Sequence, residues 1–303
     1  MPLTRYKVDK IIDGHMHPRD PEAVANRKKA MVGNERVTKW TSEHHRFHSP
    51  TYQVTLGKPE PGRDYFQNPY EVSELIDRMD EAGVAKGCMI SLPPFTPDEH
   101  VKRLYLDPHP DRFVGVSWVN PDNIHRAIKE MERSITEWGF KGFKVHPAHA
   151  GRTADHRDFF PFYEKCVELN VPCWIHSGYI PYSTFRLRDD DPLAIDEVAC
   201  RFPELTIVMC HLGWPHVDQA LAVCLKHPNV FMETSAIHPF FWPESFIKFM
   251  NSILQDKVVF ATDWNLLQID DTIVETEKLI ASQQIAEKVF RDNWKKILGP
   301  DIV

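Results

Sequence analysis

The segment IIDGHMHP (11–18) places a short apolar run directly before two histidines and a proline. In an extended strand, residues i and i+2 lie on the same side, so His15 and His17 point together while Met16 points away. An open nucleotide-binding sheet usually carries a glycine-rich phosphate turn after its first strand, and here DGHMHP stands in that place. The segment therefore predicts a buried strand that ends in a pair of candidate metal ligands.

Seven further apolar segments of strand length follow, each bounded by turn or breaker residues, and amphipathic stretches of helical period separate them. One such stretch is EVSELIDRMDEAG (71–83), which ends at a glycine. Strands that alternate with helices pair in parallel, either in an open doubly wound sheet or in a closed barrel, and eight units favour an α/β protein of the (β/α)8 TIM barrel type. The seven segments are AKGCMISL (85–92), RFVGVSWV (112–119), GFKVHP (142–147), VPCWIHS (171–177), LTIVMCH (205–211), NVFMETS (229–235) and KVVFATDW (257–264).

A long stretch, residues 18–70, separates the first strand from its helix. Connections in such barrels usually span only a few residues, and this one is rich in histidine, proline and aromatic side chains. We therefore predict one barrel domain over residues 1–303, with 18–70 as an insertion or lid at the C-terminal mouth and short helices at 21–32 and near 38–48. A contact between subunits or a mobile excursion of the chain is the alternative interpretation of this insertion.

Composition narrows the class of partner. A formal charge of −7 argues against nucleic acid, whose phosphates favour a basic protein. No apolar run is long enough to cross a membrane, and the start MPLTRYKVDK does not resemble a secretory signal. The six cysteines form no Cys-x-x-Cys pair and lie in apolar or helical contexts. These features predict buried free thiols in a cytoplasmic protein.

Polar residues recur at the C-terminal ends of the predicted strands. A single histidine is more often a packing or hydrogen-bonding residue than a ligand, but the joint pattern is unlike chance. The C-terminal strand ends of a barrel converge on one mouth, so these side chains should gather there. Three imidazoles and a carboxylate suit Zn²⁺ or a similar cation. The polar residues at these strand ends are His15 and His17 and, further along the chain, Lys144, His146, His176, His211 and Asp263.

At these positions the sequence resembles the amidohydrolase superfamily, and within it the amidohydrolase-2 branch that contains aminocarboxymuconate-semialdehyde decarboxylase-like proteins. The motifs that carry the resemblance are IDGHMHP, GFKVHP, CWIHSG, MCHLGWP, FATDW and DNWKKILG. The resemblance implies that His15, His17, His176 and Asp263 bind one divalent metal ion, with Zn²⁺ expected first and Mn²⁺ as the alternative. It further implies that His211 and Asp263 are catalytic and that the protein is a homodimer.

Three functions follow from such a site. The first is hydrolysis of an ester, lactone, amide or activated C–C bond in a cyclic or aromatic carboxylic acid by metal-activated water. In this reaction Asp263 acts as general acid–base, and His211 positions the water or stabilises the oxyanion. The second is metal-dependent decarboxylation of an aromatic or unsaturated acid, and the third is a non-catalytic metal- or ligand-binding barrel. The predicted contacts to this small-molecule substrate are Arg46, His48, Lys144, His146, Trp214 and Trp264.

Overall fold

Eight parallel strands form a single sheet in which every strand pairs with its neighbours in sequence order. This computed structural model describes residues 5–31, 69–118, 124–180, 185–264 and 266–303. All eight predicted strands are present, and the (β/α)8 TIM barrel prediction is confirmed. The strands are β1 (Ile11–Met16), β2 (Val84–Ile90), β3 (Phe113–Trp118), β4 (Gly142–Val145), β5 (Cys173–Ile175), β6 (Ile207–Met209), β7 (Val230–Glu233) and β8 (Val258–Val259).

Backbone hydrogen bonds between β1 and the segment that follows β8 close the barrel. The amide of Gly14 donates to the carbonyl of Phe260 at 3.2 Å, and the amide of Asp263 donates to the carbonyl of His15 at 2.8 Å. Met16 and Trp264 form a parallel bridge at the same seam. The first strand and the segment after the last strand therefore lie side by side, which brings the first and last predicted metal-binding motifs together.

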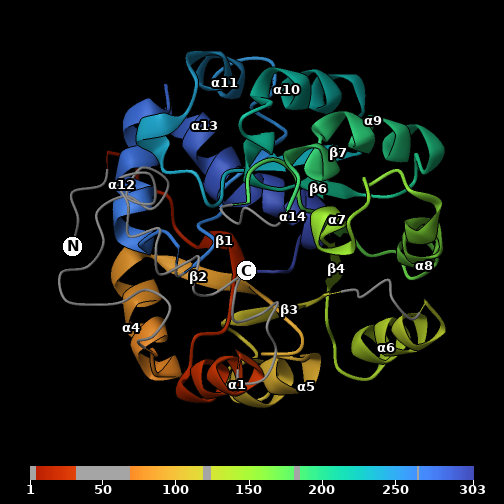
Figure 1. Cartoon of the computed structure of the whole chain (residues 1–303). Coiled ribbons are helices and arrows are strands. Elements are labelled where there is room, and N and C mark those ends of the chain that lie inside the picture. The colour runs from red at the N-terminus through yellow and green to blue at the C-terminus, as the bar shows by residue number, and fades with distance from the viewer. Residues whose placement is uncertain (1–4, 32–68, 119–123, 181–184, 265) are drawn as a thin grey trace.

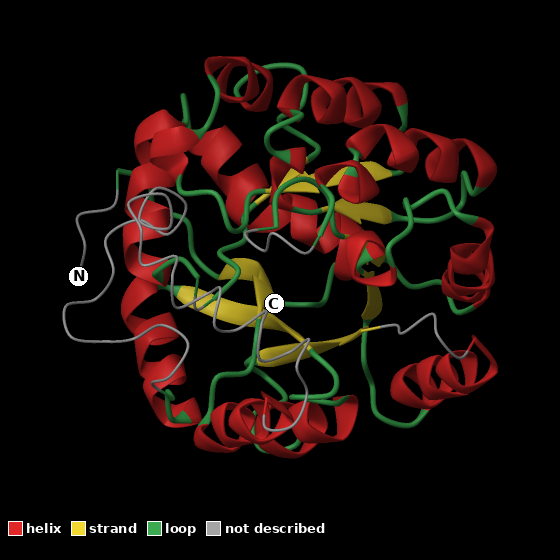
Figure 2. Ribbon diagram, in the orientation of Figure 1, coloured by secondary structure: helices red, strands yellow, loops and turns green. Residues whose placement is uncertain are grey.

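Most of the helices form an outer ring around the strands (Figure 1), and the strands occupy the middle of that ring (Figure 2). Short 3₁₀ and π segments, labelled η, join several of them. The α-helices are α1 (Pro21–Met31), α4 (Val72–Ala82), α5 (Asp98–Val101), α6 (Ile124–Thr136), α7 (Pro147–Ala150), α8 (Phe160–Glu168), α9 (Pro192–Arg201), α10 (Val217–Lys226), α11 (Glu244–Met250), α12 (Ile269–Leu279), α13 (Gln283–Glu287) and α14 (Asn293–Leu298). The η segments are η1 (Lys102–Leu106), η3 (Arg157–Phe159), η4 (Leu187–Asp190), η5 (His211–Gly213), η6 (Pro239–Phe241) and η7 (Lys288–Asp292).

Helix α4 illustrates how the sequence pattern produces an outer helix. Its residues Leu75, Met79 and Ala82 recur at helical spacing and are buried against the sheet. Gly83 ends the helix with φ 76°, a left-handed conformation that glycine adopts without the steric cost that a Cβ would add. The chain then enters β2 directly.

Apart from the core between the helices and the sheet, a separate apolar core fills the inside of the barrel. The last helix contributes to this inner core. The indole of Trp294, in α14, stacks on that of Trp174 with ring centroids 5.9 Å apart. A Cβ on Gly14 would lie 1.6 Å from the Trp294 ring, so only glycine fits at this place in the first strand. The Trp294 ring nitrogen donates to the carbonyl of Phe260 at 2.8 Å. The glycine of the opening motif is therefore explained by packing against the late DNWKK segment.

Of the predicted insertion, residues 18–31 and 69–70 lie within the described residues. There α1 confirms the helix expected at 21–32, and the helix expected near 38–48 falls outside the described part of the chain. Five of the six cysteines are buried as predicted, but Cys200, in α9, is exposed. None of the helices within the described residues is both long and apolar enough to cross a membrane.

Candidate metal centre

Three side chains from opposite ends of the chain meet at the C-terminal end of the barrel. The Nε2 atoms of His15 and His17 lie 3.3 Å apart, and Asp263 Oδ1 lies 3.8 Å and 3.4 Å from them, respectively. Metal–ligand distances of about 2.1 Å place two ligands of one tetrahedral ion roughly 3.4 Å apart. The three atoms therefore have the spacing of ligands that share one cation.

Hydrogen bonds on the far side of each ring fix which nitrogen carries the proton. The Nδ1 atom of His15 lies 2.9 Å from Glu233 Oε1, and the Nδ1 atom of His17 lies 3.1 Å from the carbonyl oxygen of Ile90. Both partners are acceptors, so each Nδ1 carries the hydrogen and each Nε2 presents a lone pair. With the carboxyl of Asp263 ionised, these atoms form three electron-pair donors that face one another. Such a donor set fits a divalent cation.

Burial shapes the protonation of these groups. Desolvation by burial, followed by the charge of Lys144, lowers the pKa of His15 well below its usual value and that of His17 to about 3. Both rings are therefore neutral at neutral pH, as metal ligands must be. Burial also raises the pKa of Asp263 to about 7, since its charge is removed from water. A bound cation would supply the missing countercharge.

A buried network links His211 to the same histidine. Ser235 Oγ donates to Glu233 Oε1 at 2.7 Å and lies 2.6 Å from Nδ1 of His211. Glu233 also accepts hydrogen bonds from the backbone amides of Ser235 at 2.6 Å and of His211 at 3.3 Å, in addition to the one from the His15 ring. The single hydroxyl hydrogen of Ser235 points to the carboxylate, so Ser235 Oγ accepts from His211 Nδ1–H. His211 is thereby held as the tautomer whose Nε2 is unprotonated.

His176 lies beside this centre, in a second group of buried side chains. Its ring centroid is 4.5 Å from that of His211 and 3.8 Å from that of His146, which in turn stacks on Trp118 at 5.2 Å. The Nδ1 atom of His176 lies 3.0 Å from Asp190 Oδ2. A metal-ligating role for His176 stays a prediction, because its ligand atoms group with those of His146 and Asp190 and not with the first three.

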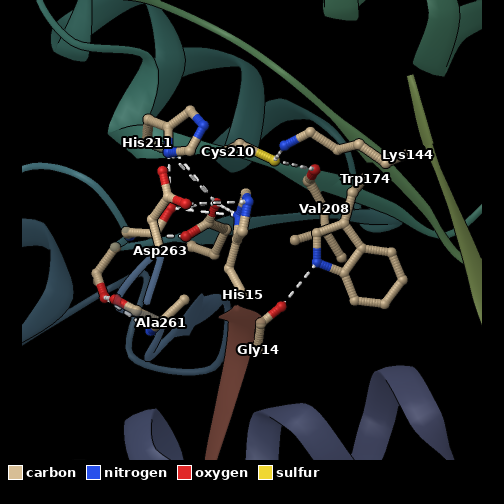
Figure 3. Close-up of polar contacts among 12 residues, drawn as sticks. Gly14, His15, Lys144, Trp174, Val208, Cys210, His211, Ala261 and Asp263 are labelled. Atoms are coloured by element: carbon tan, nitrogen blue, oxygen red, sulfur yellow. Dashed lines mark hydrogen bonds and ion pairs between the residues drawn. The ribbon is translucent and has the colours of Figure 1, made fainter. Parts of the chain in front are cut away.

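Lys144, in β4, is buried behind the histidines. Its Nζ lies 2.9 Å from Cys210 Sγ, and Figure 3 shows it approaching this cysteine from the side away from Asp263. His146 is the residue before α7, but its side chain makes no capping hydrogen bond to that helix. Its role as a substrate contact stays a prediction. The predicted contacts Arg46 and His48 lie outside the described residues.

The two predicted aromatic contacts have different surroundings. Trp214 is half-buried, and its ring lies edge-on to Tyr179 at 5.4 Å. Trp264 is buried, with its ring 5.0 Å from that of Tyr70 and beneath the guanidinium of Arg78 at 5.8 Å. Trp264 thus packs against Tyr70, which precedes α4, and against Arg78 of α4, whereas part of the surface of Trp214 is exposed. Binding of a substrate by either ring stays a prediction.

Two of the predicted catalytic residues adopt a backbone conformation that is rare for side chains with a Cβ. His211 has φ 58° and Asp263 has φ 60°, both in the left-handed region. Each such residue costs about 1–3 kcal/mol and persists only where the surroundings hold it. The strain falls two residues after β6 and four residues after β8, in the loops at the C-terminal ends of these strands.

Sequence reasoning missed three acidic or hydroxyl residues of this region: Glu233, Ser235 and Asp190. Glu233 and Ser235 belong to the polar ETS that ends NVFMETS, a strand segment to which we assigned no site residue. A carboxylate at the end of an otherwise apolar strand was the available signal. Asp190 comes from η4, outside any strand, and no pattern in the sequence marks it.

Comparison with known proteins agrees with the fold. A curated relative, the 2-keto-4-carboxy-3-hexenedioate hydratase of Sphingobium sp., is 30% identical over 165 residues, which cover 44% of this chain and 48% of the relative. The chain thus matches about half the length of this relative. An uncharacterised TIM-barrel protein from Bordetella bronchiseptica has a TM-score of 0.78 at 21% identity, with 95% of this chain and 98% of that chain covered.

A further similar structure is the 5-carboxyvanillate decarboxylase of Novosphingobium aromaticivorans, solved with manganese and 4-hydroxy-3-methoxy-5-nitrobenzoic acid. It has a TM-score of 0.69 at 18% identity and covers 96% of both chains. The family profile described as Amidohydrolase, Amidohydro_2, matches residues 12–299, which spans the barrel from β1 to the end of α14. The chain belongs to the amidohydrolase family.

Proposed function

We propose that this protein is a metal-dependent hydrolase that adds water to a carbonyl carbon of a cyclic or aromatic carboxylic acid. The bond cleaved would be an ester, lactone, amide or activated C–C bond. The observation that carries the proposal is the pairing of three converging ligand atoms, from His15, His17 and Asp263, with an unprotonated Nε2 on the neighbouring His211. This combination suits the activation of water.

The sequence left two roles open for His211, and the inferred tautomer of its ring supports one of them. A neutral ring with a lone pair on Nε2 accepts a hydrogen bond from water, and it cannot donate one to an oxyanion from that atom. Burial, ahead of every other influence, lowers the pKa of His211 well below its usual value, so the ring is neutral at neutral pH. We therefore assign His211 to positioning the attacking water, with Ser235 and Glu233 maintaining its tautomer.

His15, His17 and Asp263 would hold one divalent ion, and His176 is the proposed fourth ligand. Such an ion, when bound, lowers the pKa of water and polarises a substrate carbonyl. Imidazole and carboxylate donors suit Zn²⁺ and Mn²⁺ alike. Asp263 would accept the proton of the water and transfer it to the leaving group, because its carboxylate lies beside His15 and His17 at the mouth.

The substrate class is proposed from the names of the related proteins and from the charges near the site. The hydratase and the decarboxylase named above both act on carboxylated compounds, as their names state. The positive charge of buried Lys144 would attract a carboxylate of the substrate. His146 and Trp214 would contact a flat ring of the substrate. Arg46, His48 and Trp264 complete the set of proposed contacts.

Non-oxidative decarboxylation is the second candidate, and the name of the manganese-containing decarboxylase favours it. That reaction needs a proton donor at the carbon that loses CO₂. The unprotonated Nε2 of His211 supports the hydrolase in preference, since it can accept a hydrogen bond from the attacking water but has no proton to give to that carbon. A hydratase would use the same base and the same metal, as the name of the Sphingobium relative suggests.

The test is a panel of aryl carboxylates, lactones and unsaturated diacids incubated in ¹⁸O-labelled water with the Zn²⁺- and Mn²⁺-loaded protein. Hydrolysis predicts one ¹⁸O atom in a new carboxylate and no CO₂. Release of CO₂ without incorporation of ¹⁸O would replace the proposal by decarboxylation. We also propose a cytoplasmic homodimer, which gel filtration with light scattering tests separately.

A further inference from the structure

Three side chains of ligand type meet between α9 and the end of α10, away from the centre described above. They are Asp196, Cys200 and His227. His227 Nε2 lies 2.6 Å from Asp196 Oδ1 and 4.0 Å from Cys200 Sγ, and one ligand atom from each residue lies within 4.8 Å of the others. A carboxylate, a thiol and an imidazole are thus already gathered in one place.

The two helices explain why these residues meet. Asp196 and Cys200 are four residues apart on α9 and therefore share one face of that helix. His227 directly follows α10, which lies beside α9 in the outer ring (Figure 1). The sequence shows no close spacing of ligands here, because the third residue comes from the next helix.

This cluster lies at the opposite end of the barrel from the candidate metal centre. His227 stands just before β7, so it belongs to the end of the barrel where strands begin. His15, His17 and Asp263 stand where strands end. In this fold, chemistry takes place at the C-terminal ends of the strands, and the opposite face serves stability.

An ammonium group already occupies the cluster. Nζ of Lys226 lies 2.7 Å and 2.9 Å from the two carboxylate oxygens of Asp196 and 3.8 Å from Cys200 Sγ. The surroundings therefore accept a positive charge at this point. The Lys226 side chain is 55% exposed, so it can swing into solvent and vacate the place.

We propose that Asp196, Cys200 and His227 form a second metal site, selective for a thiophilic divalent cation of the Zn²⁺ class. Thiolate and imidazole donors favour such ions over Mg²⁺ or Ca²⁺, and water would complete the coordination because Cys200 is exposed. Binding releases the thiol proton to solvent, displaces the Lys226 ammonium and breaks the hydrogen bond between His227 and Asp196. The hydrogen of a neutral His227 ring moves from Nε2 to Nδ1, so that Nε2 can bind the ion. The ion would cross-link α9 to the end of α10.

Titration with Co²⁺ tests this site on the full-length protein. A thiolate bound to Co²⁺ gives an intense sulfur-to-metal charge-transfer absorption in the near ultraviolet, which the nitrogen and oxygen donors of His15, His17 and Asp263 cannot give. We expect this band to appear and to disappear when Zn²⁺ is added in competition. Failure of the band to appear at millimolar Co²⁺ would overturn the proposal.

Variants assign the band to its residues. Cys200→Ser and His227→Gln should abolish it, while Asp263→Asn should leave it unchanged. Lys226→Ala should tighten Co²⁺ binding several-fold, because the competing ammonium is removed. Circular dichroism establishes that each variant is folded. A band that persists in Cys200→Ser would assign the signal to another cysteine, such as Cys210, and would reject the site.

Discussion

Nδ1 of His15 lies 2.9 Å from Oε1 of Glu233, although 218 residues separate the two in the chain. This contact orients the ring so that Nε2 faces His17 and Asp263. The same carboxylate oxygen accepts the hydroxyl of Ser235, which in turn holds His211. Glu233, at the end of β7, therefore determines the tautomers of two rings: that of His15 directly, and that of His211 through Ser235.

Replacing Glu233 by glutamine should weaken metal binding. Glutamine is uncharged and replaces Oε2, which accepts the backbone amide of Ser235, by an NH2 group that cannot accept, so the side chain can no longer hold the His15 ring as the carboxylate does. Loss of such a supporting contact typically costs roughly 10–100-fold in metal affinity. Competition with a chromogenic chelator measures this. Glu277→Gln is the matched control, since Glu277 is also buried but lies on α12 beside the N-terminal segment. Equal affinities for wild type and Glu233→Gln would refute the role of this contact.

Ser235→Ala should lower turnover more than substrate binding. Without the hydroxyl, His211 loses its Nδ1 partner and the tautomer with a free Nε2 is no longer favoured. We expect kcat to fall by up to about 10²-fold with KM nearly constant, in line with the usual contribution of acid–base groups. Ser235→Thr keeps a hydroxyl and should restore most of the rate. A rise in KM alone would argue that Ser235 serves only packing.

Asp263→Asn should remove nearly all turnover while the fold persists. Asparagine adopts left-handed backbone conformations as readily as aspartate, so φ 60° at this position is retained. The variant loses both a metal ligand and the proposed base, and we expect a loss of at least roughly 10²-fold in kcat. Thermal unfolding followed by circular dichroism checks the fold. Retained activity would exclude Asp263 from the chemistry.

Removal of the metal by a chelator should abolish activity reversibly. Dialysis against a chelator, followed by addition of Zn²⁺ or Mn²⁺, should restore turnover with one ion per chain at the His15–His17–Asp263 centre. Metal content measured by mass spectrometry gives the stoichiometry, and the Cys200→Ser variant removes any contribution from the second site proposed above. Full activity in the metal-free protein would contradict the proposed chemistry.

Stability should depend on the ionisation of Asp20, which anchors the start of α1. Burial alone would raise the pKa of Asp20, but hydrogen bonds from His100, from the Ala23 amide and from the Tyr105 hydroxyl hold it below the usual value. A lowered folded-state pKa gives stability that is complete above about pH 4 and is lost as the pH falls through the folded pKa.

Asp20→Asn tests this contribution, because asparagine still caps a helix but carries no charge. We expect the variant to be less stable by about 1–3 kcal/mol at neutral pH, the usual value of hydrogen bonds to a charged group. Urea unfolding should show this difference shrinking as the pH falls below about 4, the ordinary pKa of aspartate. A difference that is constant with pH would mean that the charge contributes nothing.

The sequence alone determined the barrel and the first metal motif. Eight apolar segments separated by amphipathic stretches define alternating strands and helices, and two-residue periodicity places His15 and His17 on one side of β1. These are local properties, set by side-chain alternation and by helix-ending residues such as Gly83. They can be read without knowing which distant segments pack together.

Only the tertiary structure decided how the strand ends meet. Glu233, Ser235 and Asp190 acquire their partners across the barrel or from a loop, and the cluster of Asp196, Cys200 and His227 exists because two outer helices lie side by side. Closure of β8 against β1 brings Asp263 to the first histidines. Hydrogen bonds over such separations depend on three-dimensional packing, which no local pattern of residues encodes.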